Sequence, residues 1–139
     1  MPKALQIDKQ GKLKVSEADI ERTCTEWLAL DGWRCLKTNP CSDRARGKGF
    51  GELGMADCLY IRYVRDSWNP SFRAEAPLCG VMWIEWKRRG SKAKAHQTAW
   101  HVAERARGAL VLVAGKDFPA SIEDFQAWYR ASGLMRKAL

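Results

Sequence analysis

The sequence predicts an α/β domain in which helices flank a mixed β-sheet, with the elements in the order αβββαβα. One observation is the succession of "VMWIEWK" (81–87), "SKAKAHQTAWHVAERAR" (91–107) and "ALVLVAG" (109–115), which has the pattern of a strand, a helix and a strand. A second observation is two short runs, "WRCLKT" (33–38) and "MADCLYIRYV" (55–64), which indicate two earlier strands. Periodic apolar positions near both ends of the chain predict the first and last helices.

The first helix is expected to run from Ser16 to about Asp31. Its apolar residues recur about every 3.6 positions, and Gly32 follows as a stop signal. Residues 1–15 precede it as an N-terminal extension, in which "DKQG" (8–11) is consistent with a hairpin.

The middle of the chain alternates strands with long connections. The segment 39–54 is dense in glycine and turn-forming residues and is predicted to be a loop. The strand at 55–64 is expected to lie beside the central strand at 81–87, with residues 65–80 as a long connection between them. The run at 109–115 is unbroken in its apolar character, which suits a strand buried on both faces.

The last helix is predicted within "SIEDFQAWYRAS" (121–132). Ser121 has the chemistry of an N-cap, Asp124 stands three residues later, and Gly133 follows the end. The length of 139 residues is that of one domain, so we expect a single domain over 1–139.

Composition excludes several classes of protein. Nearly half of the residues are apolar, with charges interspersed, as in a globular protein. No apolar run approaches the about 18 residues that span a bilayer, and the N-terminus lacks the apolar core of a signal peptide. We therefore expect a cytoplasmic protein without a membrane partner. The five cysteines are an odd number and contain no Cys-x-x-Cys, which favours reduced thiols over a zinc site.

The net charge of +8 indicates an anionic partner, because clustered Lys and Arg side chains release counterions when they bind phosphate. Two clusters stand out, although each is equally compatible with a solvated surface. The candidate DNA-binding residues in them are Lys37, Arg44, Arg46 and Lys48 in the first cluster, and Arg88, Arg89, Lys92 and Lys94 in the second.

A carboxylate and an ammonium interrupt the central strand. Residues two apart in a strand face the same side, so Glu85 and Lys87 project together while Trp86 faces the other way. Asp57, at the start of the neighbouring strand, could bring a second carboxylate beside Glu85. Two such oxygens with the Trp86 backbone carbonyl suit Mg²⁺ or Mn²⁺, and Lys87 would then lie close to a scissile phosphate. Taken singly, Glu85 and Lys87 also fit a solvated strand end, and Asp57 fits a turn.

Five pieces of sequence, in order, resemble the VRR-NUC (virus-type replication-repair nuclease) family of metal-dependent PD-(D/E)xK nucleases. They are "SEADIERTCTEWLALDGW", "KTN", "GMAD", "IEWK" and "HQTAWHVAERARGALVLVA", which together cover roughly residues 16 to 114.

The resemblance implies a restriction-endonuclease-like core with a metal site at Asp57 and Glu85 and a catalytic lysine at Lys87. It also implies an accessory glutamate at Glu17 on the first helix and a glutamine at Gln97 on the helix after the central strand. Two further residues remain open. Glu21, one turn after Glu17, is the alternative helical carboxylate. Lys37, in "KTN", matches a basic position that would contact phosphate, but it also fits an ordinary strand-edge lysine.

The sequence departs from the family pattern in two places. Trp86 is bulkier than the small aliphatic residue expected between the Glu and the Lys, so it requires a roomy pocket on the reverse face. The connection at 65–80 is longer than a simple hairpin, and its Trp68 is a candidate for stacking on an unpaired base. Neither departure removes a catalytic group.

The sequence therefore predicts a Mg²⁺- or Mn²⁺-dependent endodeoxyribonuclease. The resemblance implies structure-specific cleavage of branched DNA, including four-way (Holliday) junctions, for which paired nicks would require a homodimer. Two alternatives stay open. One is a nucleic-acid-binding module without catalysis, and the other is a general or restriction-like nuclease that cuts duplex DNA.

Overall fold

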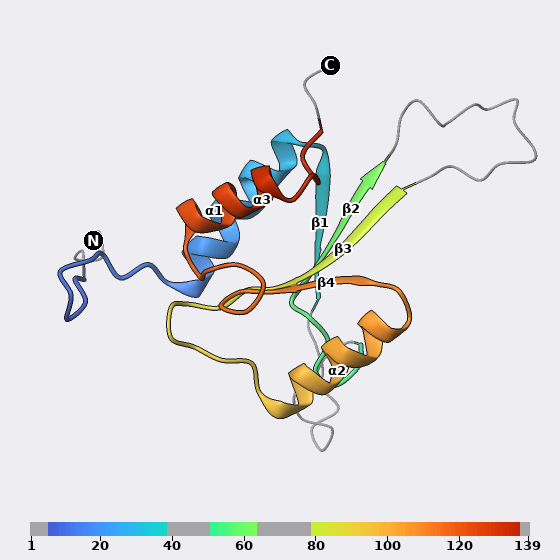
Figure 1. Ribbon diagram of the computed structural model, residues 1–139, viewed down its shortest axis with the longest axis horizontal. Coiled ribbons are helices and arrows are strands. Elements are labelled where there is room, and N and C mark those ends of the chain that lie inside the picture. The colour runs from blue at the N-terminus through green and yellow to red at the C-terminus, as the bar shows by residue number, and fades with distance from the viewer. Residues whose placement is uncertain (1–5, 39–50, 64–78, 137–139) are drawn as a thin grey trace, which may run out of the picture.

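The computed structural model describes residues 6–38, 51–63 and 79–136 of the chain. Its elements follow the predicted order αβββαβα (Figure 1). In chain order they are α1 (Glu17–Leu30), β1 (Trp33–Lys37), β2 (Cys58–Tyr63), β3 (Cys79–Glu85), α2 (Ala95–Ala106), β4 (Leu110–Val113) and α3 (Ile122–Ala131).

The four strands form one mixed sheet in the order β1-β2-β3-β4. Strand β2 pairs antiparallel with both β1 and β3, and β3 pairs parallel with β4 across the α2 crossover. The registers place Cys58 opposite Ile84 and Glu85 opposite Val113. The prediction of a mixed sheet with 55–64 beside the central strand is confirmed.

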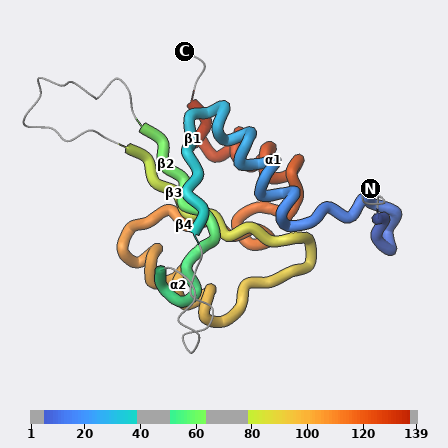
Figure 2. Tube along the Cα trace, turned by 180° about the vertical axis from the view of Figure 1, so that it is seen from behind, coloured from blue at the N-terminus to red at the C-terminus, as the bar shows by residue number. Residues whose placement is uncertain are grey.

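Helices cover both faces of the sheet. Helices α1 and α3 lie together on one face and α2 lies on the other, as both views show (Figures 1 and 2). The alternation of β3 follows from this arrangement: Met82 and Ile84 join the core under α1 and α3, while Trp83 packs edge-on against Trp100 of α2. Odd-numbered side chains of β3 therefore face α2.

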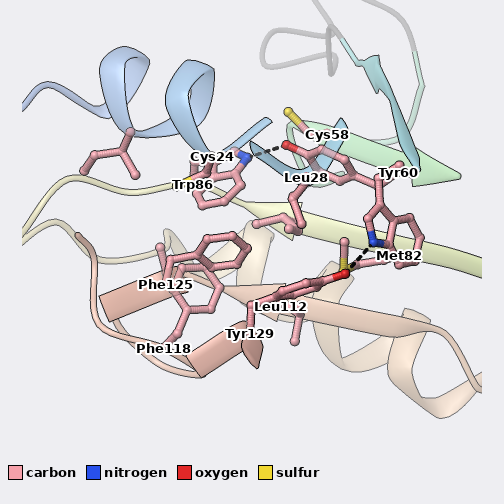
Figure 3. Packing of buried hydrophobic residues seen from close by; sticks show 14 residues of the cluster. Cys24, Leu28, Cys58, Tyr60, Met82, Trp86, Leu112, Phe118, Phe125 and Tyr129 are labelled. Atoms are coloured by element: carbon pink, nitrogen blue, oxygen red, sulfur yellow. Dashed lines mark hydrogen bonds between the residues drawn. The ribbon is translucent and has the colours of Figure 1, made fainter. Parts of the chain in front are cut away.

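The larger core provides the pocket that Trp86 requires. Its indole is fully buried between Phe118 and Phe125, with ring centroids 5.7 and 5.0 Å away, and its Nε1–H donates to the Tyr60 hydroxyl at 2.9 Å (Figure 3). A buried indole needs such an acceptor, because an unpaired donor would cost free energy. Trp86 thus anchors the end of β3 from the side opposite to Glu85 and Lys87.

Helix α2 begins later than the sequence indicated. The prediction started it at Ser91, but the N–H of Ser91 donates to the Arg88 carbonyl in a turn after β3, and the helix begins at Ala95. The other two helices have the expected caps: Ser16 accepts from the Asp19 N–H, and Ser121 accepts from the Asp124 N–H, each at 3.1 Å.

Strand β4 is buried on both faces although it is an edge strand of the described sheet. Val111, Leu112 and Val113 are almost fully buried, because the smaller core under α2 receives Val111 while the larger core receives Leu112. Its unbroken apolar run therefore reflects cover by helices on both sides.

A short hairpin precedes α1. Ile7 and Leu13 form an isolated bridge, and Gly11 turns the chain at φ +74°. Within the described ranges, no helix is long and apolar enough to cross a membrane. The predictions for Arg44, Arg46 and Lys48, and those for residues 64–78 with Trp68, lie outside the described residues.

Candidate active site

The end of β3 carries a buried ion pair on the α2 side of the sheet. The Lys87 Nζ lies 3.0 Å from Glu85 Oε1, and the two side chains are only 10% and 1% exposed. Taking two charges out of water costs several kcal/mol per ion unless other groups compensate. The surroundings of this pair therefore determine whether it is tolerated.

Gln97 on α2 provides much of that compensation. Its Nε2–H donates to Glu85 Oε1 at 2.7 Å, and its Oε1 accepts from Lys87 Nζ at 3.3 Å and from the Lys94 N–H at 2.8 Å. The three bonds fix the orientation of the amide, because its oxygen faces two donors and its nitrogen faces a carboxylate. Gln97 thus satisfies the first turn of α2 and the buried ion pair together.

Asp57 reaches the same ion pair from the residue that precedes β2, the antiparallel neighbour of β3. It directly precedes Cys58, which pairs with Ile84, so the pleat places Asp57 opposite Glu85 and on the same face. Its N–H donates to Glu85 Oε2 at 3.2 Å. Thr38 holds its carbonyl, with the backbone N–H at 2.8 Å and the hydroxyl at 2.9 Å. Asp57, Glu85, Lys87 and Gln97 therefore meet at one end of the sheet.

The two carboxyl groups repel one another. Burial, followed by the charges of Glu85 and Glu17, raises the pKa of Asp57 to about 7. Burial also raises the pKa of Glu85, although the hydrogen bond and charge of Lys87 oppose this effect. A cation between the carboxylates would relieve the repulsion.

The donor set fits a hard divalent cation. Asp57 and Glu85 offer carboxylate oxygens, and the Trp86 carbonyl follows Glu85 directly. Among the described residues, no three His, Cys, Asp or Glu side chains gather into a group that could enclose a metal ion. Mg²⁺ and Mn²⁺ suit such an open set, because they prefer oxygen and Mg²⁺ retains several waters.

Helix α1, on the face of the sheet opposite to α2 (Figure 1), brings negative charge toward the site. Glu17, the first residue of α1, is close enough for its charge to raise the pKa of both Asp57 and Glu85. Glu21, the alternative residue, instead pairs with Lys37 at 3.0 Å and accepts from the Cys58 thiol at 3.5 Å. The hydrogen bond with Glu21, followed by its charge, raises the pKa of Lys37, whose side chain is 69% exposed.

The basic residues after β3 lie on the surface. Arg88, Arg89, Lys92 and Lys94 are all exposed, in the segment that joins β3 to α2. Because this segment begins one residue beyond Lys87, its cations border the buried cluster.

The turn before β2 contains two residues whose importance the sequence did not reveal. Glu52 Oε2 accepts from the Trp100 indole N–H at 2.8 Å. Gly54, at φ +81°, lies so close to α2 that a Cβ would fall 2.2 Å from the His96 carbonyl oxygen. We name residues 51–56 the strap, because they tie the chain leading into Asp57 to the helix that carries Gln97. The spacing in "GELG" was the available signal, since paired glycines indicate a tight turn.

Comparisons with protein-family models, curated proteins and solved structures found no match to this chain.

Proposed function

We propose that the protein is a Mg²⁺- or Mn²⁺-dependent endodeoxyribonuclease with a PD-(D/E)xK-type core similar to that of the VRR-NUC family. The observation that carries the proposal is the convergence of Asp57, Glu85, Lys87 and Gln97 at one end of the sheet, with Lys87 3.0 Å from Glu85. Glu85 ends β3 and Lys87 lies two residues beyond it, while Gln97 comes from α2 and Asp57 directly precedes β2. Glu85 and Lys87 are buried and Asp57 and Gln97 are half-buried, and hydrogen bonds join the four residues. A set of this kind suits phosphodiester hydrolysis.

Lys87 supplies positive charge where the reaction needs it. The ammonium is held between Glu85 Oε1 and Gln97 Oε1, so its direction is fixed before substrate arrives. A fixed cation stabilises the negative charge that develops on the phosphoryl oxygens during in-line attack by water. Lys87 can also orient the attacking water by donating a hydrogen bond to its oxygen.

Asp57 and Glu85 would hold the divalent cation, with the Trp86 carbonyl as a further oxygen ligand. When bound, the cation supplies Lewis-acid polarisation of the phosphate and a more acidic water. Gln97 keeps Glu85 in place through the 2.7 Å bond to Oε1, and Asp57 holds Oε2 through its N–H. Glu17 contributes through water or through a second cation.

The proposed substrate is branched DNA such as a four-way junction, as the VRR-NUC resemblance implies. The net charge of +8 and the exposed Arg88, Arg89, Lys92 and Lys94 favour contacts to the DNA backbone. Recognition would then depend on the shape of the junction more than on base sequence. A homodimer would supply the two sites that paired nicks require.

The experiment that tests this proposal is cleavage of end-labelled four-way junction, flap, linear duplex and single strand. Each substrate is incubated with the purified protein in Mg²⁺, in Mn²⁺ or in EDTA. We expect metal-dependent paired nicks in the junction and a loss of rate of about 10²- to 10³-fold in Lys87→Ala. Lys116→Ala is the matched control, because Lys116 is an exposed lysine in the turn after β4.

The pattern of products separates the competing functions. Cleavage of every duplex, or at one defined sequence, would replace junction resolution with a general or restriction-like nuclease. If the wild-type protein bound DNA but cut nothing in either metal, the catalytic role of Glu85 and Lys87 would be wrong. The binding module would then take its place.

A further inference from the structure

A groove of about 860 Å³ lies beside the candidate site, between the N-terminal hairpin, the segment after β3 and the start of α3. The figures show the hairpin projecting on the same side as that segment (Figures 1 and 2). Of the segment after β3, the groove is lined by Arg88 and the three residues that follow it, so the lining comes within one residue of Lys87. Among the described residues, the lining does not include Asp57, Glu85 or Gln97. The groove is therefore a separate feature of the surface.

Four cationic side chains line the groove. Lys12 and Lys14 come from the hairpin, and Arg88 and Arg89 come from the segment after β3. All four are exposed, and within the described part of the chain none of them forms an ion pair. Cations from two separate elements therefore converge here, and they outnumber the three carboxylates of the lining, which are Asp8, Glu123 and Asp124.

The acidic residues of the groove have local hydrogen-bond donors. Asp8 Oδ1 accepts from the N–H groups of Gln10 and Lys12 at 2.8 and 2.9 Å within the hairpin turn. Asp124 Oδ2 accepts from the Ser121 hydroxyl at 2.8 Å at the start of α3. Glu123 lies in the first turn of the same helix, where a carboxylate interacts favourably with the helix dipole. Hydrogen bonds from the hairpin backbone lower the pKa of Asp8 most, and the charges of Arg89 and Lys12 add to this effect. Each of the three acids thus has a local partner, and the lining keeps an excess of positive charge.

The segment after β3 connects the groove to Lys87 over a short stretch of chain. Two extended residues span at most about 7 Å, so the backbone at Arg89 lies within about 7 Å of that at Lys87. Phosphates along one strand recur at about 3.4 Å of helix rise. A strand with its scissile phosphate at Lys87 would therefore have phosphates one to a few nucleotides away within reach of Arg88 and Arg89.

We propose that this groove, formed by Lys12, Lys14, Arg88 and Arg89, binds the backbone phosphates of the DNA strand next to the cleavage point. The inference rests on the proposed nuclease function, to which it adds a phosphate-binding subsite. The N-terminal hairpin is then a substrate-binding element.

The test is the salt dependence of DNA binding by full-length protein in EDTA, where no cleavage can occur. The probes are a fluorescein-labelled linear duplex and a single strand of the same sequence, titrated between about 50 and 200 mM salt. For Lys12→Gln/Lys14→Gln we expect weaker binding and a salt slope smaller in magnitude by about 1.5, since each lost phosphate contact removes about 0.7 to 0.9.

The matched control is Lys9→Gln/Lys116→Gln, which removes the same charge. Lys9 lies in the same hairpin but outside the groove lining, and Lys116 lies after β4. The control should leave the salt slope unchanged. If the salt slope of the groove variant fell with single-stranded DNA alone, the groove would bind an unpaired strand. If the slope fell with both probes, the groove would bind a strand within duplex.

An equal change in the groove variant and the control would overturn the proposal, because binding would then follow net charge. So would an unchanged slope in the groove variant, or no DNA binding by the wild type. Cleavage of the junction by wild-type protein in Mg²⁺ keeps the two proposals apart. Cleavage with an unchanged slope removes the subsite alone, whereas a changed slope without cleavage removes the nuclease function and leaves the binding groove.

Discussion

At the scale of single residues, the cluster around Glu85 consists of charges that depend on one another. Glu85 is 1% exposed, and Lys87 is its cationic partner at 3.0 Å. Removing one member of a buried pair leaves an uncompensated charge and is strongly destabilising, whereas removing both is often neutral. Each member of the pair therefore needs the other to remain buried, and the two are the centre of the proposed chemistry.

We expect Lys87→Met to lower the free energy of unfolding by about 3 kcal/mol at pH 8 in EDTA. Glu85→Gln in the same chain should restore most of this loss, because neither position of the pair then carries a charge. Urea unfolding of the wild type, both single variants and the double variant measures the coupling. Additive effects in this cycle would show that the two side chains do not interact in solution.

His101 carries a second prediction at this scale. It is 2% exposed on α2, and its Nε2 has no hydrogen-bond partner among the described residues. Burial, followed by the charges of Arg105, Lys116 and Lys87, lowers its pKa to about 4, although Asp117 opposes the shift. An unfolded histidine takes up its proton near pH 6.5, so the unfolded state binds more protons between about pH 6.5 and 4. The contribution to stability is present above pH 6.5 and is lost as the pH falls toward 4.

We therefore expect the free energy of unfolding of the wild type to fall by about 2 kcal/mol on account of His101 when the pH is lowered from 7.5 to 5. His101→Leu should remove that part of the acid dependence, because leucine has no proton to gain. Urea midpoints of both proteins at the two pH values provide the measurement. An identical pH dependence in the variant would place the acid sensitivity elsewhere.

At the scale of elements, the strap at residues 51–56 connects the approach to β2 with α2. The bond from Trp100 to Glu52 and the close approach of Gly54 to His96 fix the distance between the chain leading to Asp57 and the helix that carries Gln97. Glu52 and Gly54 lie outside the helices and strands, yet they determine where the chain leading to Asp57 meets α2.

We expect Gly54→Ala to lower the free energy of unfolding by about 3 kcal/mol or more and to slow cleavage. A Cβ at this position would overlap a backbone oxygen, which no side-chain rotation can relieve, and φ is +81°. Gly108→Ala is the control: its φ is +97°, but no atom lies within 4 Å of the added carbon. The control should cost only the left-handed backbone strain of about 1 to 2 kcal/mol. Equal losses in thermal or urea unfolding would contradict the role of the strap.

At the scale of the whole molecule, a partly buried polar network joins distant parts of the chain. Arg62 of β2 donates to Asp31 Oδ2 at 2.9 Å and to the Leu134 carbonyl at 2.7 Å. The Tyr129 hydroxyl bonds to the same carboxylate and accepts from the Trp33 indole N–H at 2.8 Å. This network fastens α3 and the residues after it to the end of α1 and the edge of the sheet.

We expect Arg62→Met to lower the free energy of unfolding by about 2 to 3 kcal/mol, because Asp31 would remain partly buried without its cation. The corresponding fall in Tm is about 3 °C for each kcal/mol in a chain of this size. Arg22→Met is the control, since its pair with Asp19 is exposed and should contribute less than about 1 kcal/mol. Similar shifts in the two melting curves would refute the special role of the network.

Local patterns were enough to predict the element order and the mixed sheet, because each element carries its own periodicity and end signals. They also placed Glu85 and Lys87 on one side of the chain, since alternation in an extended segment is a local property, although β3 itself ends at Glu85. The strap and the Arg62 network could not be predicted, because they depend on a glycine conformation and on contacts between residues far apart in sequence. The start of α2 was wrong for a related reason: Ser91 has the chemistry of a helix cap, but the turn after β3 uses its N–H.

The central claim is that Asp57, Glu85 and Lys87 form a metal-dependent hydrolytic site. The most direct measurement is the single-turnover rate of four-way junction cleavage in Mg²⁺ by wild-type protein and Asp57→Asn, with DNA binding measured in the same samples. We predict that the variant binds the junction as tightly as the wild type but cleaves it at least about 100-fold more slowly, because one carboxylate ligand is lost. Equal cleavage rates in the two proteins, or no cleavage by the wild type, would contradict the account.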